Sequence, residues 1–281
     1  MPNRRFSACF VVFAMVVALL IAGCTNPVTS DPPGSREDRP GDPLDQPPDP
    51  PAGDPDPSDP ETDEVFLIVT EINFSDETPG VVAAEFNGSG LSHPPDIGQL
   101  NAEAWQITGF SDGDQMFGQV ETTGDLARGA SGGGVSTGGV YAFVVEPENV
   151  ALGVQPTASD FQPGSIALKL AAPDARLESV EIAYSIWHFN DQDRSTVWRL
   201  EWSADGSVWM DTGTDPLASP ATSDPDPQWI SVRQSMTLAR SEIIALEWLY
   251  LRWIAVDGDG TGARDECALD DIMIAFTCIA P

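Results

Sequence analysis

A period-two alternation of apolar and polar residues is the feature that most constrains how this chain can fold. Across residues 180–187 every second side chain is large and apolar, and similar alternation recurs in residues 198–203 and 248–256. A period of two puts alternate side chains on opposite faces of a strand, whereas a helix repeats about every 3.6 residues. The folded part of the chain is therefore predicted to be all-β.

Further strand-like runs are separated by glycine, proline and aspartate. The predicted strands are residues 65–69, 104–108, 140–145, 165–170, 180–187, 198–203, 229–236, 248–256 and 269–276. Asp205-Gly206 between two of these runs predicts a hairpin with a tight primed turn, and residues 241–244 predict one helical turn. Many short strands without crossover helices predict a two-sheet antiparallel β-sandwich over residues 65–281, with a jelly-roll topology preferred.

The N-terminus carries an export signal. Arg4 and Arg5 precede an apolar run that is too short to span a bilayer and fits a signal peptide of residues 1–23. Residues 21–24 (Ile-Ala-Gly-Cys) resemble the bacterial lipobox, which implies acylation of Cys24 and a lipid anchor in the membrane of the cell envelope. Thr25 follows the cysteine, and by resemblance to lipoprotein sorting the absence of aspartate there favours an outer membrane if the cell has one. The alternative is an ordinary signal peptide with an accidental cysteine.

Residues 24–64 differ abruptly in composition from the remainder of the chain. Asp-Pro steps recur and large apolar residues almost vanish. Proline lacks an amide donor and the carboxylates repel one another, so this segment is predicted to be a disordered tether between the anchor and the folded domain.

Charge excludes one class of partner. The chain has 13 basic and 44 acidic residues, for a formal net charge of −31. Such a surface repels phosphate backbones, so nucleic acid is not expected as a partner, whereas divalent cations and neutral ligands are compatible with it.

Two cysteines remain in the predicted domain, Cys267 and Cys278. The segment between them is predicted to be one extended strand, which separates them by roughly 35 Å, far beyond disulfide reach. They could pair only if the chain turned back on itself.

Several segments of the domain also resemble a known kind of module. They are residues 128–143, 151–153, 184–187, 203–209, 249–253 and 268–272. Together they resemble the jelly-roll, concanavalin A-like modules of secreted bacterial proteins, and the closing Leu-Asp-Asp-Ile is similar to that of extracellular MAM adhesion domains. The resemblance implies a β-sandwich with a binding or accessory role.

Six carboxylates near the C-terminus form a candidate calcium site. They lie in and beside a glycine-rich loop: Asp257, Asp259, Asp265, Glu266, Asp270 and Asp271. Calcium takes six to eight oxygen ligands, which such a loop could complete with backbone carbonyls, although the spacing is not that of an EF-hand. In the alternative, the carboxylates are solvated or paired with Arg252 or Arg264. A second acidic loop, residues 190–193, could join the site.

Four aromatic residues form the candidate ligand site. Trp187 and Phe189 lie opposite the apolar face of one predicted strand, and Trp248 and Tyr250 lie opposite the apolar face of another. Exposed aromatic rings on a sheet could stack on sugar rings. In the alternative, they pack beneath loops or in a broad core, because tryptophan is mostly buried.

Catalysis has less support in the sequence than binding. The chain has two histidines, His93 and His188, and in its folded part no Glu-x-Asp-x-x-Glu run of acids. Its G-x-S-x-G matches lie in the glycine run of residues 129–139, which precedes a predicted strand and not the helix that a nucleophile elbow requires. The favoured function is therefore a surface-anchored lipoprotein whose calcium-stabilised sandwich binds polysaccharide or another extracellular partner. The alternatives are a carboxylate-dependent hydrolase of cell-surface glycans and an adhesion module with no small ligand.

Overall fold

A computed structural model of the chain describes residues 64–280, and every statement of structure below concerns that segment. It belongs to a compact unit that spans Pro60–Pro281. The predicted signal peptide, the lipidation of Cys24 and almost all of the predicted tether lie outside the described residues.

One of the two large sheets has seven strands. Its strands are β1 (Val65–Ile72), β5 (Ala130–Ser131), β6 (Gly139–Glu146), β7 (Asn149–Gln155), β9 (Arg176–Phe189), β13 (Trp229–Ala239) and β15 (Glu266–Ile279). Their order is β13-β9-β15-β7-β6-β5, and β1 also pairs with β15. Every pair is antiparallel except β5 with β6.

The second large sheet has six strands. They are β4 (Trp105–Thr108), β8 (Gly164–Ala171), β10 (Arg194–Ser203), β11 (Met210–Asp211), β12 (Leu217–Ala218) and β14 (Trp248–Gly260), in the order β11-β10-β14-β8-β4 with β12 beside β10. A small parallel pair joins β2 (Leu91–Ser92) to β3 (Leu100–Asn101). The helix found in residues 64–280 is a 3₁₀ turn, Gly124–Leu126, and that part of the chain holds no helix long and apolar enough to cross a membrane.

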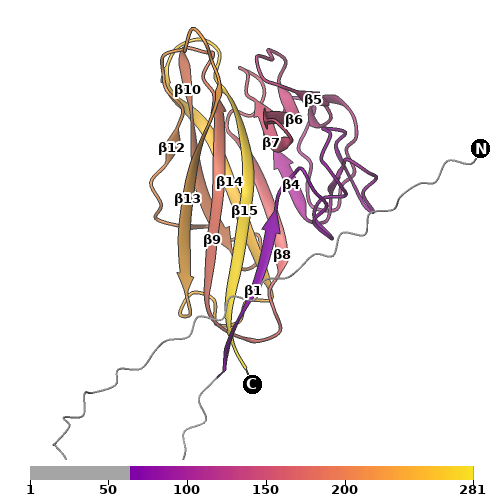
Figure 1. Ribbon diagram of the computed structural model, residues 1–281, viewed down its shortest axis with the longest axis vertical. Coiled ribbons are helices and arrows are strands. Elements are labelled where there is room, and N and C mark those ends of the chain that lie inside the picture. The colour runs from indigo at the N-terminus through magenta and orange to yellow at the C-terminus, as the bar shows by residue number, and fades with distance from the viewer. Residues whose placement is uncertain (1–63, 281) are drawn as a thin grey trace, which may run out of the picture. The chain divides into compact units, whose positions relative to one another are not determined.

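The strand order is that of a jelly roll. From β8 onward the principal strands alternate between the sheets: β8, β10 and β14 lie in the six-stranded sheet, and β9, β13 and β15 in the seven-stranded one. The last strand, β15, enters the middle of its sheet between β9 and β7, as Figure 1 shows. This double Greek-key order confirms the predicted antiparallel sandwich.

A bulge in β15 explains the Leu-Asp-Asp-Ile sequence. Leu269 and Ile272 are both buried in the core, although residues three apart on a regular strand face opposite sides. The register against β9 shifts between Asp270 and Met273, and Asp271 has a positive φ of 49°. The extra residue restores the alternation, so both apolar side chains face inward.

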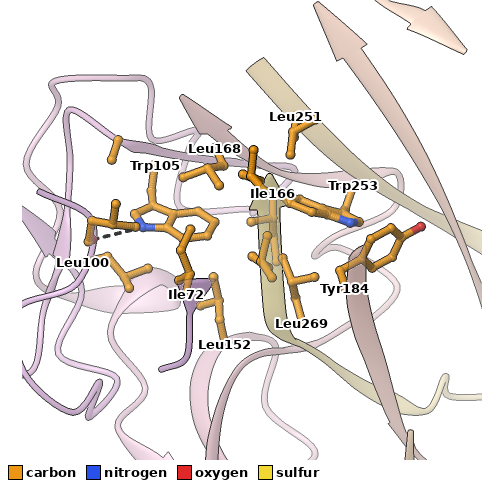
Figure 2. Packing of buried hydrophobic residues seen from close by; sticks show 14 of the residues in the cluster. Ile72, Leu100, Trp105, Leu152, Ile166, Leu168, Tyr184, Leu251, Trp253 and Leu269 are labelled. Atoms are coloured by element: carbon orange, nitrogen blue, oxygen red, sulfur yellow. Dashed lines mark hydrogen bonds between the residues drawn. The ribbon is translucent and has the colours of Figure 1, made fainter. Parts of the chain in front are cut away.

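The core lies between the two sheets and is built around large aromatic side chains. Trp253 of β14 meets Tyr184 of β9 edge to face, with ring centroids 5.6 Å apart, so this contact joins the sheets. Trp105 of β4 is fully buried and donates its Nε1–H to the carbonyl of Val81 at 3.1 Å. Figure 2 shows these rings among the surrounding leucines and isoleucines.

Most of the predicted strands are confirmed. The inward row of residues 180–187 is buried as expected: Val180, Ile182, Tyr184 and Ile186 are each at most 3% exposed. Residues 241–244 form turns and not the predicted helical turn. The missed strands are β7 and the two-residue strands β2, β3, β5 and β12. Strand β7 is buried over nearly its whole length. It therefore lacks the alternation of apolar and polar residues that marks a strand with one solvent-exposed face.

Cys267 and Cys278 are both buried, unpaired and on the same strand, β15. This placement agrees with the extended segment predicted between them. Their thiols behave as small apolar groups in the core.

Replacing Trp253 with alanine is expected to lower the free energy of unfolding by about 3–5 kcal/mol, because it leaves a cavity where the sheets meet. Trp248→Ala, on the opposite face of the same strand, is the matched control and should change stability by about 1 kcal/mol or less. Denaturant unfolding of both variants tests this expectation. Equal losses would show that Trp253 does not hold the sheets together.

Candidate functional site

The outer face of the six-stranded sheet carries a row of half-buried side chains from β14. Trp248, Tyr250 and Arg252 alternate there with the core residues on the other side of the strand. Neighbouring strands contribute to the same face, because Lys169 of β8 pairs with Tyr250 and Glu201 of β10 pairs with Arg252. Successive positions in such a row are about 6.6 Å apart.

Cation–π and edge contacts hold two of these rings in place. The Lys169 Nζ lies 4.2 Å from the centroid of the Trp248 ring and 6.0 Å from that of Tyr250. Phe117, from the loop after β4, meets Tyr250 edge to face at 5.8 Å. The single lysine of the chain therefore lies beside two aromatic rings, with its charge close to the sheet surface.

Arg252 orders the other end of the row. Its guanidinium donates from Nε and Nη2 to Glu201 Oε2 and lies 4.0 Å from the centroid of the Trp209 ring. A planar guanidinium can bind a carboxylate and stack on an aromatic ring at the same time. Trp209 is thereby held over the sheet as a fourth ring of this surface, which we call the aromatic face (Phe117, Lys169, Glu201, Trp209, Trp248, Tyr250 and Arg252).

The predicted Asp-Gly hairpin brings Trp209 to this face, but its turn is not the predicted tight primed turn. Residues 204–209 separate β10 from β11, and of Asp205 and Gly206 the positive φ is found at Gly206 alone. Asp205 accepts backbone hydrogen bonds from Ser207 at 2.8 Å and Val208 at 2.9 Å, and these bonds, led by the one from Val208, lower the pKa of its carboxyl. Gly206 has a φ of 72°, and a Cβ there would lie 2.9 Å from the Tyr250 ring. Glycine is needed both for the turn and for the close approach to Tyr250.

Chemically, the aromatic face combines apolar ring area with fixed polar groups. Such a surface suits a ligand with flat apolar patches and hydroxyl groups, because rings contribute area while charged side chains fix orientation. The row lies on a sheet rather than in a closed cavity, so it is open to a long ligand.

The other two predicted ligand aromatics lie elsewhere. Trp187 and Phe189 are on the outer face of the seven-stranded sheet, where Trp187 is 7% exposed and packs with Tyr141 and Phe143. Phe189 packs on Trp229 with ring centroids 5.4 Å apart, and a Cβ on Gly133 would lie 3.2 Å from the Phe189 ring. The glycine-rich loop thus approaches this second aromatic group, and Trp187 is buried there.

The structure adds residues that the sequence analysis did not select: Phe117, Lys169, Glu201, Trp209 and Arg252. The Asp-Gly hairpin was identified, but the position of Trp209 over Arg252 depends on the pairing of β10 with both β11 and β14. A cross-strand partner such as Lys169 can be found only when the register is known.

The six predicted calcium ligands do not form one group. Asp257 is shared by two arginines: it pairs with Arg194, and its Oδ1 lies 3.1 Å from Arg264 Nε. Gln162 also donates to its Oδ2. Asp259 is exposed and offers its backbone carbonyl to Ser195.

The remaining four carboxylates lie in two separate places. Asp265 and Glu266 are at the start of β15, and Asp270 and Asp271 are farther along this strand. Asp265 accepts the backbone N–H of Gln192 at 3.1 Å and Glu266 that of Val135 at 2.6 Å. Farther along the strand, Asp270 accepts from Asn149 and Asp271 from Ser185. Within residues 64–280 no three acidic, histidine or cysteine side chains are placed to hold a metal ion. The six do not offer a common ligand set, and calcium binding stays a prediction.

Three of these carboxyl groups are fully buried, and burial changes their ionisation. Loss of hydration raises the pKa of Asp265 to about 6 and that of Asp270 to about 6. Burial, together with the neighbouring carboxyl of Asp191, also raises the pKa of Glu266. These groups therefore hold protons at a higher pH than exposed carboxyls do.

Comparisons with known proteins give remote similarities. No family model matches the chain, and no curated protein matches it. Among solved structures it is similar to TmCBM27, a carbohydrate-binding module described for specific mannan recognition, with 14% identity and a TM-score of 0.39 over 76% of this chain and 98% of that one. It is also similar to the K1 cleaved adhesin domain of Lys-gingipain from Porphyromonas gingivalis W83, with 8% identity and a TM-score of 0.36 over 74% and 97%.

A CBM4 structure is similar as well, with 16% identity and a TM-score of 0.33 over 63% of this chain and 88% of that one. Similarities this remote carry no argument about what the chain binds. The jelly-roll assignment rests on the strand order, and the site rests on its own geometry.

The raised pKa values predict a pH dependence of stability. An acid with a higher pKa in the folded than in the unfolded chain binds its proton more tightly when folded, so stability is greatest below the unfolded pKa and falls as pH rises through the folded one. The melting temperature should therefore fall between about pH 5 and pH 8.

Glu266→Gln is expected to raise the free energy of unfolding at pH 8 by on the order of 2 kcal/mol and to flatten this pH dependence. Glutamine keeps an oxygen for the Val135 N–H and has no charge to bury. Exposed Glu181→Gln, on the neighbouring strand β9, is the matched control and should leave the profile as in the wild type. Thermal melts from pH 5 to pH 8 test both, and parallel profiles for all three proteins would contradict the expectation.

Proposed function

We propose that this chain binds polysaccharide on the aromatic face of its six-stranded sheet. The observation that carries the proposal is the row of Trp248, Tyr250 and Trp209, held in place by Lys169, Phe117 and Arg252. A row of rings on an open sheet suits a repeating ligand, since each ring can cover the apolar side of one sugar unit.

The polar groups of the face support the same ligand class. Lys169, Arg252 and Glu201 supply donors and acceptors beside the rings, as hydroxyl-bearing sugars require. These charges are already paired with rings or with each other, so a neutral ligand need not separate an ion pair to bind.

The proposed site of action rests on the N-terminal sequence. We place the protein in a bacterial cell envelope, outer membrane favoured, held by acylated Cys24 at the end of the 24–64 tether. Several acyl chains on one cysteine anchor a protein stably, and a proline-rich tether of this length reaches on the order of 100 Å. The domain could then meet glycans at a distance from the membrane.

The hydrolase alternative has no specific observation in its favour. The carboxyls with raised pKa values, Asp265, Glu266 and Asp270, are 0% exposed. A general acid must come within hydrogen-bond reach of the bond it cleaves. Their burial is what a structural role would produce.

Trp248→Ala and Tyr250→Ala are each expected to weaken polysaccharide binding about tenfold, because stacking of one ring contributes on the order of 1–1.5 kcal/mol. A glycan array of the full chain identifies the ligand, and isothermal titration with that ligand measures the loss. Trp229→Ala is the matched control, since Trp229 is a half-buried tryptophan on the outer face of the other sheet.

Two outcomes would contradict the proposal. One is an array on which the folded wild type binds no glycan. The other is a glycan that Trp248→Ala binds as tightly as the wild type does. If Trp229→Ala alone loses binding, the ligand site is on the seven-stranded sheet.

A further inference from the structure

A second candidate site is a cavity at the end of the sandwich where β14 ends and β15 begins. It has a volume of about 380 Å³, within the range of small-ligand sites. Its lining includes Arg264 from the β14–β15 loop, Gln192 from the β9–β10 loop, Arg194 at the start of β10, Gln155 at the end of β7 and Gln162 from the β7–β8 connection. Its lining is thus rich in side-chain amides and contains two guanidinium groups.

Arg264 leaves one nitrogen unused although the side chain is buried. The side chain is 2% exposed, its Nε lies 3.1 Å from Asp257 Oδ1, and its Nη2 donates to the carbonyl of Phe161 at 2.7 Å. Its Nη1 is buried and has no hydrogen-bond partner among residues 64–280. A buried charged donor without a partner is costly, so a group that accepts from it would be bound favourably.

Two other lining residues also carry an unpaired polar atom. The Arg194 Nε and the Gln155 Oε1 are also buried without partners in the described part of the chain. Gln155 uses its amide nitrogen to donate to the carbonyls of Pro156 at 2.7 Å and Arg264 at 3.2 Å, which leaves its oxygen as an acceptor. The lining residues therefore contain charged donors and a neutral acceptor whose hydrogen-bonding capacity is unused.

The charged side chains that line the cavity are both positive. They are Arg194 and Arg264, and Asp257 pairs with both. Asp265 and Glu266 accept backbone N–H groups of the lining residues Gln192 and Val135, and burial raises the pKa of both carboxyls. Guanidinium N–H groups match the geometry of a carboxylate, so the lining suits an anion.

We propose that this cavity binds a sugar acid, with the carboxylate on Arg264 and Arg194 and the hydroxyl groups on the amides of Gln155, Gln162 and Gln192. The choice of a sugar among carboxylates rests on the polysaccharide binding proposed above. The cavity is separate from the aromatic face, because Tyr250 and Asp257 are seven residues apart on β14, roughly 23 Å along a strand. The two sites can therefore fail independently.

The probes are galacturonate and galactose, which differ only in the carboxylate at C6. Titration of the full chain, followed by isothermal calorimetry, should show galacturonate binding at least tenfold more tightly than galactose. Sodium sulfate at the same ionic strength is the third probe. Equal affinity for galactose, or sulfate binding as tight as that of galacturonate, would overturn the proposal.

Two substitutions locate the binding. Arg194→Gln removes one positive charge, and Gln192→Glu adds a negative charge with little change of shape; each should weaken galacturonate binding at least tenfold. Gln228→Glu is the matched control, because it makes the same glutamine-to-glutamate change at an exposed position outside the lining. It should leave galacturonate affinity unchanged. Melting temperatures verify that each variant is folded.

The results separate this proposal from that of the aromatic face. If the two cavity variants bind galacturonate as the wild type does, the cavity is not the site. Loss of polysaccharide binding in Trp248→Ala with unchanged galacturonate binding supports two distinct sites. Loss of galacturonate binding in Trp248→Ala, with none in the cavity variants, would overturn the cavity and leave one ligand site.

Discussion

The fold depends on the insertion of β15 between its neighbours. This strand pairs with β9 along one side. Along the other side it pairs first with β7 and then with β1, so three strands are hydrogen-bonded to it. The change of neighbour falls at the Asp270–Asp271 bulge, which also keeps Leu269 and Ile272 in the core. A strand of strict period two would have put one of those side chains outside. The two aspartates lie at this bulge, where Asp270 accepts from Asn149 and Asp271 from Ser185.

Strand β14 links that core to the candidate site. Its inward residues include Trp253, whose contact with Tyr184 joins the sheets, and its outward residues include Trp248, Tyr250 and Arg252. The rigidity of the inner row fixes the outer row, because side chains of one strand share a backbone. A ligand site on such a strand is preorganised, and ordering it does not consume binding energy.

Period-two alternation allowed the sequence to indicate the sandwich, most of its strands and two members of the aromatic face. It could not indicate β7, which is buried on both sides, nor Lys169 and Trp209, whose places depend on cross-strand register. The acidic loop shows the same limit. Sequence proximity suggested one cluster, but adjacent residues on a strand point to opposite faces. Five of the six carboxylates accept from different donors, and Asp259 is exposed. The alternative drawn from the sequence was that Arg252 or Arg264 pairs with one of these carboxylates, and Arg264 does pair with Asp257.

The charge distribution constrains which glycans suit both sites. At physiological salt, charges on an acidic surface act over about 8 Å, so a densely charged polyanion would be repelled along its length. A single carboxylate inside the cavity would instead meet guanidinium groups at contact, where screening is weak. The aromatic face, with its charges already paired, favours neutral sugar units. A largely neutral polysaccharide with widely spaced acidic residues is therefore the ligand whose charge pattern agrees with both surfaces.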